Sequence, residues 1–353
     1  MKTLLRFRCI CKSWRAIIDE PGFTFIHLNL FNKNHDATRL LTMEAKGSDP
    51  TLNVEHMKNP TKPTEAIVSL NGSGTPYVTV MGSANGLLLM GTKSWQIALV
   101  NPSTKRALDL PRAPIAPLIN KFNAAVGFDP LSNDVKVVVI PATLKASYYK
   151  VEAMAIYKLS TRSWMSMSVI NNNNSSCSWY LKAHRPLFSG GALHWLARDA
   201  NNEDDHCPTH VAIFNLGTEK FNFIRLPNGD KVTEDKARFP LLIGESMGVL
   251  DVTSQRLNIR VMRKHGKHLS WTKWFRSNIP INTYNQFRSW CDCALLLVEN
   301  FGKLLIKGDS VRSYDFETRR FEQLTAYNAE KYIGHHVESL AFHKGWPLPN
   351  DHI

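Results

Sequence analysis

Long hydrophobic runs are missing from this chain of 353 residues. No stretch is apolar over the roughly 20 residues that a membrane-spanning helix needs. The basic N-terminus also lacks the apolar segment and the small-residue cleavage site of a secretory signal. The sequence therefore predicts a protein without a membrane span that resides in the cytoplasm, the nucleus or both.

Cysteine is scarce, with six residues in the whole chain. Four of them form two Cys-x-Cys pairs, Cys9 with Cys11 and Cys291 with Cys293. In a chain of this size without a signal peptide, we expect reduced thiols rather than a framework of disulfides.

The motifs of common enzymes are absent as well. There is no Gly-x-Ser-x-Gly elbow, no phosphate-binding loop and no His-Glu-x-x-His helix. The metal-capable side chains of residues 204–210 have no second cluster that would complete a zinc site, so a solvated loop is expected there. His194, between Leu193 and Trp195, is expected to pack or hydrogen-bond on a strand. The sequence thus predicts no catalytic residue, no metal and no cofactor.

Acidic residues are outnumbered by basic ones, 30 to 43, which gives a net charge of +13. Such a charge favours an acidic partner or a weak affinity for nucleic acid. The basic residues are scattered, however, and the densest group, residues 260–267, is interrupted by Val261, Met262 and Gly266. With no RNP-type motif, zinc-finger spacing or long basic arm, nucleic acid is not the expected main partner.

The N-terminal residues carry a helical pattern. Apolar residues at steps of three and four predict one face of a short helix, formed by Leu4, Phe7, Cys11, Trp14 and Ile18. The basic residues between them should be solvated, and Pro21-Gly22 should end the helix. On pattern alone, this would be an amphipathic helix packed on its own domain.

The rest of the chain changes character twice. Residues 32–65 are polar and show no period, so they are expected to form a linker with at most one strand. In residues 66–345, short apolar runs alternate with Gly, Pro, Asn and Asp, which predicts a domain of many short strands. Residues 346–353 would form a C-terminal tail.

A strand–turn–strand unit recurs in the predicted β domain. In residues 155–164, 212–221 and 312–321, a Thr precedes an aromatic ring by three positions, and residues 259–271 fit the same frame. The four rings lie 57, 50 and 50 positions apart. A period of about fifty residues predicts a mainly β fold, a kelch-like β-propeller or propeller-like array of about five to seven units. The alternative is a β-sandwich or an irregular β domain.

Each unit has further expected features. The Thr turn should reverse the chain, and the ring after it should cover the hairpin and pack between neighbouring units. Glycine turns, such as Asn85-Gly86 and Gly190-Gly191, should open the first strands. The periodic placement of the tryptophans predicts that most of them lie in the core, among Trp14, Trp164, Trp195, Trp271 and Trp274.

The residue types near the N-terminus are more informative than their helical spacing. Residues 4–15 read Leu-Leu-Arg-Phe-Arg-Cys-Ile-Cys-Lys-Ser-Trp-Arg, and residues 16–23 read Ala-Ile-Ile-Asp-Glu-Pro-Gly-Phe. Together they resemble the second half of an F-box, in the form found in plant F-box proteins with an F-box-associated interaction domain. The F-box of that family begins with a proline- and leucine-rich helix, so residues 1–31 would be a partial, helical F-box truncated at its N-terminus.

The β domain carries the other half of this resemblance. Residues 82–88, 100–111, 126–138, 191–196, 214–221 and 270–275 follow one another as in the F-box-associated domain. Residues 336–340 resemble its closing strand. The ordered run of matches extends from residue 4 to about residue 340.

The resemblance implies a non-catalytic, substrate-recognition adaptor of an SCF-type cullin–RING ubiquitin ligase. The β domain would bind a target protein, and the F-box would bind a Skp-type linker. By resemblance, the Skp-facing residues are Leu4, Leu5, Phe7, Arg8, Cys11, Lys12 and Trp14. Two alternatives stay open: an orphan protein-binding propeller that recruits no ligase because its F-box is incomplete, and a propeller enzyme.

Overall fold

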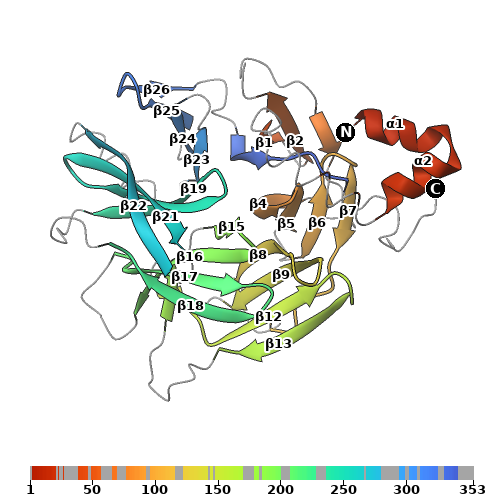
Figure 1. The fold of residues 1–353 in the computed structure, drawn as a ribbon, viewed down its shortest axis with the longest axis horizontal. Coiled ribbons are helices and arrows are strands. Elements are labelled where there is room, and N and C mark those ends of the chain that lie inside the picture. The colour runs from red at the N-terminus through yellow and green to blue at the C-terminus, as the bar shows by residue number, and fades with distance from the viewer. Residues whose placement is uncertain are drawn as a thin grey trace. The chain divides into compact units, whose positions relative to one another are not determined.

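The computed structural model describes residues 2–20, 23, 27, 39–46, 49–56, 66–69, 77–92, 96–115, 122–141, 144–145, 148–169, 179–182, 185–199, 207–227, 236–265, 268–279, 294–298, 302–307, 311–324 and 330–340. Within these residues the chain is mainly β, with two short helices followed by 27 strands (Figure 1). It divides into two compact units, Met1–Arg112 with Ala329–Ile353, and Ala113–Asn328.

The N-terminal helical segment is broken in its middle. Helices α1 (Lys2–Ile10) and α2 (Lys12–Asp19) are separated by Cys11, whose backbone is extended with φ −154° and ψ 167°. The Cys11 Sγ accepts a hydrogen bond from the backbone N–H of Trp14 at 3.5 Å, and so caps α2. The prediction of one continuous helix is therefore wrong, although α2 does end at Asp19, before the Pro-Gly pair.

The first unit contains two four-stranded antiparallel sheets. In one, with the order β27-β1-β2-β3, the first strand of the chain pairs with the last. The other has the order β4-β5-β6-β7. The strands are β1 (Arg39–Lys46), β2 (Asp49–His56), β3 (Ala66–Ser69), β4 (Tyr77–Ala84), β5 (Leu87–Thr92), β6 (Ile97–Asn101), β7 (Arg106–Asp109) and β27 (Glu330–His336).

Two of these strands correct the interpretation of residues 32–65 as a linker with at most one strand. Strands β1 and β2 pair along their full length, and Leu41, Met43 and Leu52 on them are buried. Sequence reasoning missed them because polar residues interrupt both strands and Pro50 lies in β2, so neither strand reads as an apolar run. The second partner of β1, β27, lies about 290 positions later in the chain and leaves no local signal.

The second unit contains four antiparallel sheets. Their strand orders are β13-β12-β9-β8, β10-β11-β14-β16-β17-β18 with β15 paired to β16, β19-β20-β21-β22, and β23-β24-β25-β26. The strands are β8 (Phe122–Asp129), β9 (Asp134–Pro141), β10 (Leu144–Lys145), β11 (Tyr148–Lys150), β12 (Ala153–Lys158), β13 (Ser163–Ser168), β14 (Trp179–Lys182), β15 (Leu187–Ser189), β16 (Ala192–Asp199), β17 (His210–Asn215), β18 (Lys220–Arg225), β19 (Ala237–Ile243), β20 (Ser246–Val252), β21 (Arg256–His265), β22 (His268–Asn278), β23 (Ala294–Val298), β24 (Lys303–Lys307), β25 (Val311–Asp315) and β26 (Phe321–Gln323).

The Thr turns close hairpins of one recurring geometry. Two rings face each other across each hairpin, in the pairs Tyr157 with Trp164, Phe214 with Phe221, and Tyr314 with Phe321. The residue after the Thr has a positive φ in each turn, 52° at Arg162, 56° at Glu219 and 58° at Arg319. This left-handed residue reverses the chain, as the sequence predicts.

A polar side chain at the start of the turn holds this geometry. Asn215 Oδ1 and Asp315 Oδ1 each accept a hydrogen bond at 2.8 Å from the backbone N–H of the Thr three positions later. In the hairpin between β12 and β13 the equivalent residue is Lys158. There Asp134, from the neighbouring strand β9, accepts a hydrogen bond from the Ser160 backbone N–H at 2.9 Å instead.

Successive sheets of the second unit pack on each other through apolar cores. One core joins β9 and β12 to β16 and β17, a second joins β16 and β17 to β20, and a third joins β20 and β21 to β24 and β25. With the two sheets of the first unit, the described residues form six sheets, within the predicted range. The rings follow the prediction in part, because Trp195 is buried whereas Trp14 and Trp274 are 44% and 39% exposed.

Candidate protein-binding surface

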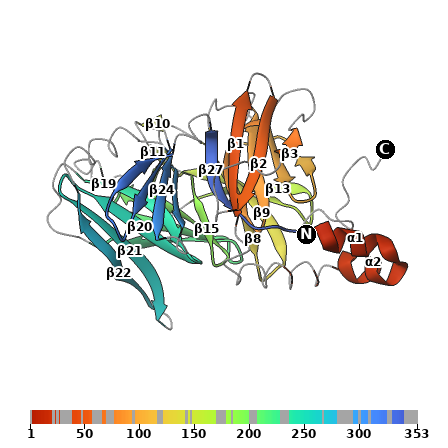
Figure 2. The same cartoon turned by 90° about the horizontal axis from the view of Figure 1, so that it is seen from above.

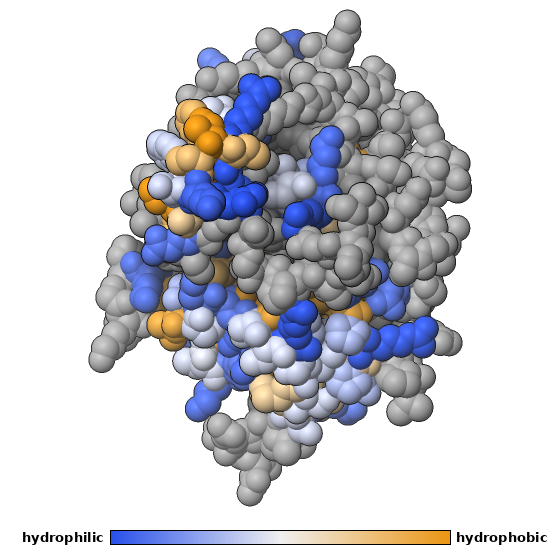
Figure 3. Space-filling view, turned by 90° about the vertical axis from the view of Figure 1, so that its right-hand side faces the viewer, coloured by the Kyte–Doolittle hydropathy of each residue, from blue (hydrophilic) through white to orange (hydrophobic). Residues whose placement is uncertain are grey.

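The helical segment exposes large apolar side chains. Phe7 is 39% exposed, Ile10 65%, Trp14 44% and Ile17 49%. They make up four of the eight large hydrophobic side chains that are exposed in the described part of the chain. Figure 3 shows apolar residues beside hydrophilic ones on this helical segment. Exposed apolar residues that gather in this way mark a protein-binding surface.

Phe7 and Trp14 pack against each other across the helix break. Their ring centroids lie 5.5 Å apart and their planes are inclined by 29°. An aromatic pair of this kind stabilises the packing of α1 on α2. Ile18, from the same predicted stripe, is instead fully buried, so the side chains of the stripe do not all lie on one exposed face.

The other residues of the predicted Skp-facing set have varied surroundings. Leu4 and Arg8 are half-buried, whereas Cys11 and Lys12 are exposed. Leu5 lies in α1, but its side chain is outside the described residues. The structure thus brings together Phe7, Cys11 and Trp14, the last two through the capping hydrogen bond.

Sequence reasoning missed Ile10 and Ile17. Together with Phe7 and Trp14 they recur at steps of three, four and three, which is also a helical spacing. The predicted stripe used the same two rings with other partners, so the pattern alone allowed both sets.

Basic side chains surround these apolar residues. Residues 2–20 include five Lys and Arg but only two Asp and Glu. Arg6, Lys12 and Arg15 are exposed, as predicted. An apolar patch with a positive rim fits a partner whose surface is apolar at the centre and acidic around it.

The other candidate residues have structural surroundings. His194 is 4% exposed on β16, with Nδ1 at 3.3 Å from the Leu187 carbonyl oxygen. Burial lowers the pKa of His194 to about 4, so the ring is neutral near pH 7. It packs and hydrogen-bonds on a strand, as predicted.

The predicted loop of residues 204–210 is described only from Cys207 onward. The Cys207 Sγ donates a hydrogen bond to the Lys236 carbonyl oxygen at 3.3 Å, and burial raises the pKa of this thiol. Cys291 and Cys293 lie outside the described residues. Within the described ranges, no group of three or more His, Cys, Asp and Glu side chains could hold a metal ion. Also within these ranges, no helix has the length and apolar composition to cross a bilayer.

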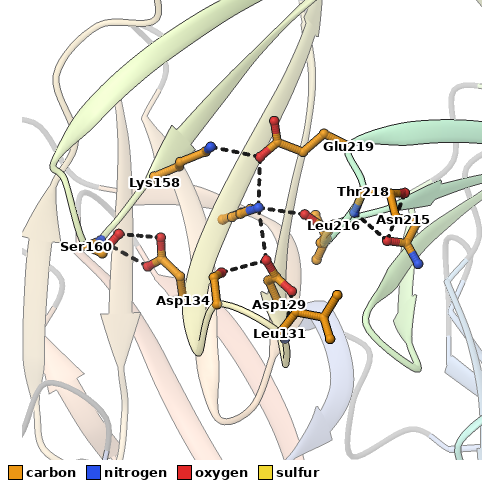
Figure 4. A network of polar contacts seen from close by, with 11 residues as sticks. Asp129, Leu131, Asp134, Lys158, Ser160, Asn215, Leu216, Thr218 and Glu219 are labelled. Carbon is orange, nitrogen blue, oxygen red and sulfur yellow. Dashed lines mark hydrogen bonds and ion pairs between the residues drawn. The ribbon is translucent and has the colours of Figure 1, made fainter.

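A buried polar network joins two sheets of the second unit (Figure 4). The Lys136 Nζ lies 2.6 Å from the Leu216 carbonyl oxygen, 2.8 Å from Glu219 Oε1 and 3.1 Å from Asp129 Oδ2. Burial lowers the pKa of Lys136, but the two carboxylates more than offset it, so its pKa is raised. Every charge here has a partner, which indicates a structural role rather than a reactive site.

Comparison with known families agrees with this fold. Residues 38–310 match the family model described as F-box associated beta propeller domain, and residues 1–26 match that of the F-box domain. The first match covers most of the chain, so the chain belongs to the F-box-associated β-propeller family. The predicted resemblance and the predicted mainly β, propeller-type fold behind a short helical F-box are thus confirmed.

Three proteins of Arabidopsis thaliana are similar to this chain. It is 26% identical over 281 residues to Putative F-box protein At3g16210, covering 77% of this chain and 69% of the relative. It is 22% identical over 377 residues to F-box protein CPR1, covering 93% and 83%. It is 23% identical over 296 residues to F-box/kelch-repeat protein At3g23880, covering 77% and 74%. F-box proteins with such a domain fit substrate adaptors in general, and their families are generally non-enzymatic.

Proposed function

We propose that this protein is a substrate-recognition adaptor of an SCF-type cullin–RING ubiquitin ligase. In this proposal the helical segment binds a Skp-type linker, the β region binds a target protein, and catalysis belongs to other subunits. The proposal involves no cofactor, and it places the chain in the cytoplasm, the nucleus or both.

The exposed apolar side chains within the F-box match carry this proposal. The proposed interface keeps the seven residues assigned by resemblance and adds Ile10 and Ile17. Burying a large apolar side chain contributes about 1.5–3 kcal/mol. Losing the Phe7 and Trp14 rings from an interface is therefore expected to weaken binding by about a hundredfold or more.

The test is co-purification of the full chain with a plant Skp-type linker. We expect the unmodified chain to bind and the Phe7→Asp/Trp14→Asp double variant to fail. Because these rings also pack on each other, Ile10→Asp serves as a second variant, since Ile10 is 65% exposed. The matched control is Leu131→Asp/Leu269→Asp, at apolar residues that are 81% and 38% exposed in the β region.

The alternative is an orphan protein-binding module, and one observation favours it. Among the described side chains of α1 and α2, only Ile18 is buried, so the helical segment has little apolar support of its own. If the unmodified chain is folded by circular dichroism and captures no Skp-type linker, ligase recruitment fails and the orphan module replaces it. Equal binding by all variants would exclude this surface as the contact.

A further inference from the structure

The hairpin of β21 and β22 is longer than its neighbours. These strands have 10 and 11 residues, whereas no other described strand exceeds eight. The last residue of β21 that pairs with β20 is Val261, so Met262 and the residues after it pair with β22 alone (Figure 2). We name residues 256–265 and 268–278 the basic ribbon.

The basic ribbon lies in a part of the chain that has no acidic residue. Residues 252–291 contain eight Lys and Arg and no Asp or Glu, and so supply +8 of the net charge of +13. Six of these basic residues are on the described ribbon, namely Arg256, Arg260, Arg263, Lys264, Lys273 and Arg276. Strand pairing brings these basic residues together on one hairpin, although they are spread along the sequence.

Asp251, an acidic side chain that approaches this ribbon, already pairs with basic residues outside it. Asp251 Oδ2 lies 3.8 Å from Arg260, but the same carboxylate is 3.0 Å from Arg238 and 3.3 Å from Lys236. Arg260 also lies directly opposite Lys273 across the ribbon, and like charges in that position destabilise a strand pair. Among the residues that the structure describes, Asp251 thus does little to neutralise the positive charge of the ribbon.

Three of its cations are available to a partner. Arg263, Lys264 and Lys273 are exposed, and none of them forms an ion pair with another residue that the structure describes. Lys264 and Lys273 share one face of the pleat, and Arg263 lies on the other. An occupant that meets both faces must run along the ribbon rather than sit on one side of it.

The tryptophans of the ribbon disfavour nucleic acid as this occupant. Trp271 Nε1 donates a hydrogen bond to the Arg225 carbonyl oxygen at 3.1 Å, and Trp274 packs edge-on against Phe316 at 5.4 Å. Both rings are thus engaged within the unit. Single-stranded nucleic acid is bound largely by stacking successive bases on several aromatic faces, whereas Trp274, at 39%, is the one exposed ring among the described side chains of the ribbon.

We propose that the basic ribbon binds an extended, acidic segment of the target protein. Strand β22 is the outermost strand of its sheet, so an extended segment can lie beside it and add a strand through main-chain hydrogen bonds. The Asp and Glu side chains of that segment meet Lys273, Lys264 and Arg263. This proposal adds to the adaptor function the kind of target segment that the protein recognises. It rests on the adaptor function, because only an adaptor would have a target protein as its ligand.

The other outermost strands of the second unit offer less. Strands β13 and β18 have six residues each and β26 has three, against 11 in β22. The strands at the opposite ends of these sheets, β8, β10, β19 and β23, have eight, two, seven and five. Strand β22 thus presents the longest edge and the surplus of charge together, and this coincidence singles out the ribbon.

The test measures binding of a fluorescent peptide of repeating Thr-Thr-Glu-Glu, as long as β22, to the purified full chain. In an extended strand this repeat places carboxylates on both faces. We expect binding that weakens with added salt. We also expect the Arg263→Glu/Lys264→Glu/Lys273→Glu variant to lose about tenfold or more in affinity. The control, Lys105→Glu/Lys220→Glu/Arg320→Glu, makes the same charge change at exposed positions on other hairpins and should bind as the unmodified chain does.

Several outcomes would overturn the proposal. These are no binding of the peptide at low salt, equal affinity for the ribbon variant and the control, or tighter binding of a single-stranded oligonucleotide of matched length. Undiminished binding of a backbone N-methylated peptide would overturn the pairing along β22. Capture of the Skp-type linker by the ribbon variant is measured in parallel, so that a failure here is distinguished from a failure of the adaptor function.

Discussion

Lys136 and Glu219 form an ion pair that connects two sheets. The ammonium group lies 2.8 Å from Glu219 Oε1, in the turn that joins β17 to β18, while Lys136 itself belongs to β9. The side chains of Lys136 and its second acidic partner, Asp129, are only 4% and 2% exposed. A buried charge that loses its partner costs far more than an exposed one.

We therefore expect Lys136→Met to lower the free energy of unfolding by about 3–5 kcal/mol, because it leaves the buried Asp129 carboxylate without its ammonium, whereas Glu219 keeps Lys158. Lys158→Met is the matched control, since Lys158 Nζ lies 2.9 Å from the same Glu219 carboxylate but is 32% exposed. Its loss should be about 1 kcal/mol or less. Denaturant unfolding measures both, and equal losses would show that burial does not govern this network.

His194 predicts a dependence of stability on pH. Burial lowers its pKa to about 4, whereas an unfolded imidazole titrates near about 6.5. As pH falls, the unfolded state binds the proton first. The stability that comes from a neutral His194 is therefore complete above about pH 6.5 and is lost progressively down to about pH 4, by about 3 kcal/mol in total.

The His194→Gln variant removes this titration. We expect its free energy of unfolding to fall less than that of the unmodified chain between neutral pH and about pH 4. Urea unfolding across this range gives the comparison. Parallel pH profiles for the two proteins would contradict a neutral, buried His194.

Gly86 occupies a turn that accepts no side chain. Its φ is +76°, and a Cβ there would come within 2.4 Å of both the Ser339 Cβ and the Val337 carbonyl oxygen. We expect Gly86→Ala to cost about 3 kcal/mol or more, from backbone strain and overpacking together.

Gly190→Ala is the control for the free-energy cost of backbone strain alone. Gly190 has a similar φ of +57°, but nothing lies within 4 Å of the added Cβ. Its cost should be about 1–2 kcal/mol. Thermal unfolding of both variants separates the two effects, and a Gly86 loss no larger than that at Gly190 would refute the close packing.

Asn215 is expected to stabilise its hairpin through its side-chain oxygen. Asn215→Ala removes the acceptor for the Thr218 backbone N–H, 2.8 Å away, and should lower the free energy of unfolding by about 1 kcal/mol. Asn215→Asp keeps an acceptor and should stay close to the unmodified chain. A destabilised aspartate variant would mean that the amide donors, not the oxygen, hold the turn.

The hairpins could be predicted from sequence because their determinants are local. A Thr, a left-handed residue after it and an opposed ring lie within ten positions of one another, as in residues 212–221. The pairing of β1 with β27 has no such signal, and the segment that holds β1 was interpreted as a linker. Short-range sequence patterns predict single hairpins, whereas the pairing of distant strands, which completes a sheet, is not visible in them.

The candidate surface was predicted in part for the same reason. Phe7 and Trp14 followed from helical spacing and from the F-box resemblance, and both are exposed. The break at Cys11 was not foreseen, because Cys is not a usual N-cap residue. The charge of the basic ribbon was likewise hidden, since Arg260 and Lys273 lie 13 positions apart in sequence and become neighbours only through strand pairing.

The pairing of β1 with β27 also sets an order of events during synthesis. Ribosomes add about 5–20 residues per second, so β1 leaves the ribosome about 15–60 s before its last partner is made. Over that time one edge of β1 is open to other chains, which is a known route to aggregation. The nascent chain thus depends on residues 330–336, and a stop codon ahead of them would leave an incomplete sheet for chaperones and proteases to act on.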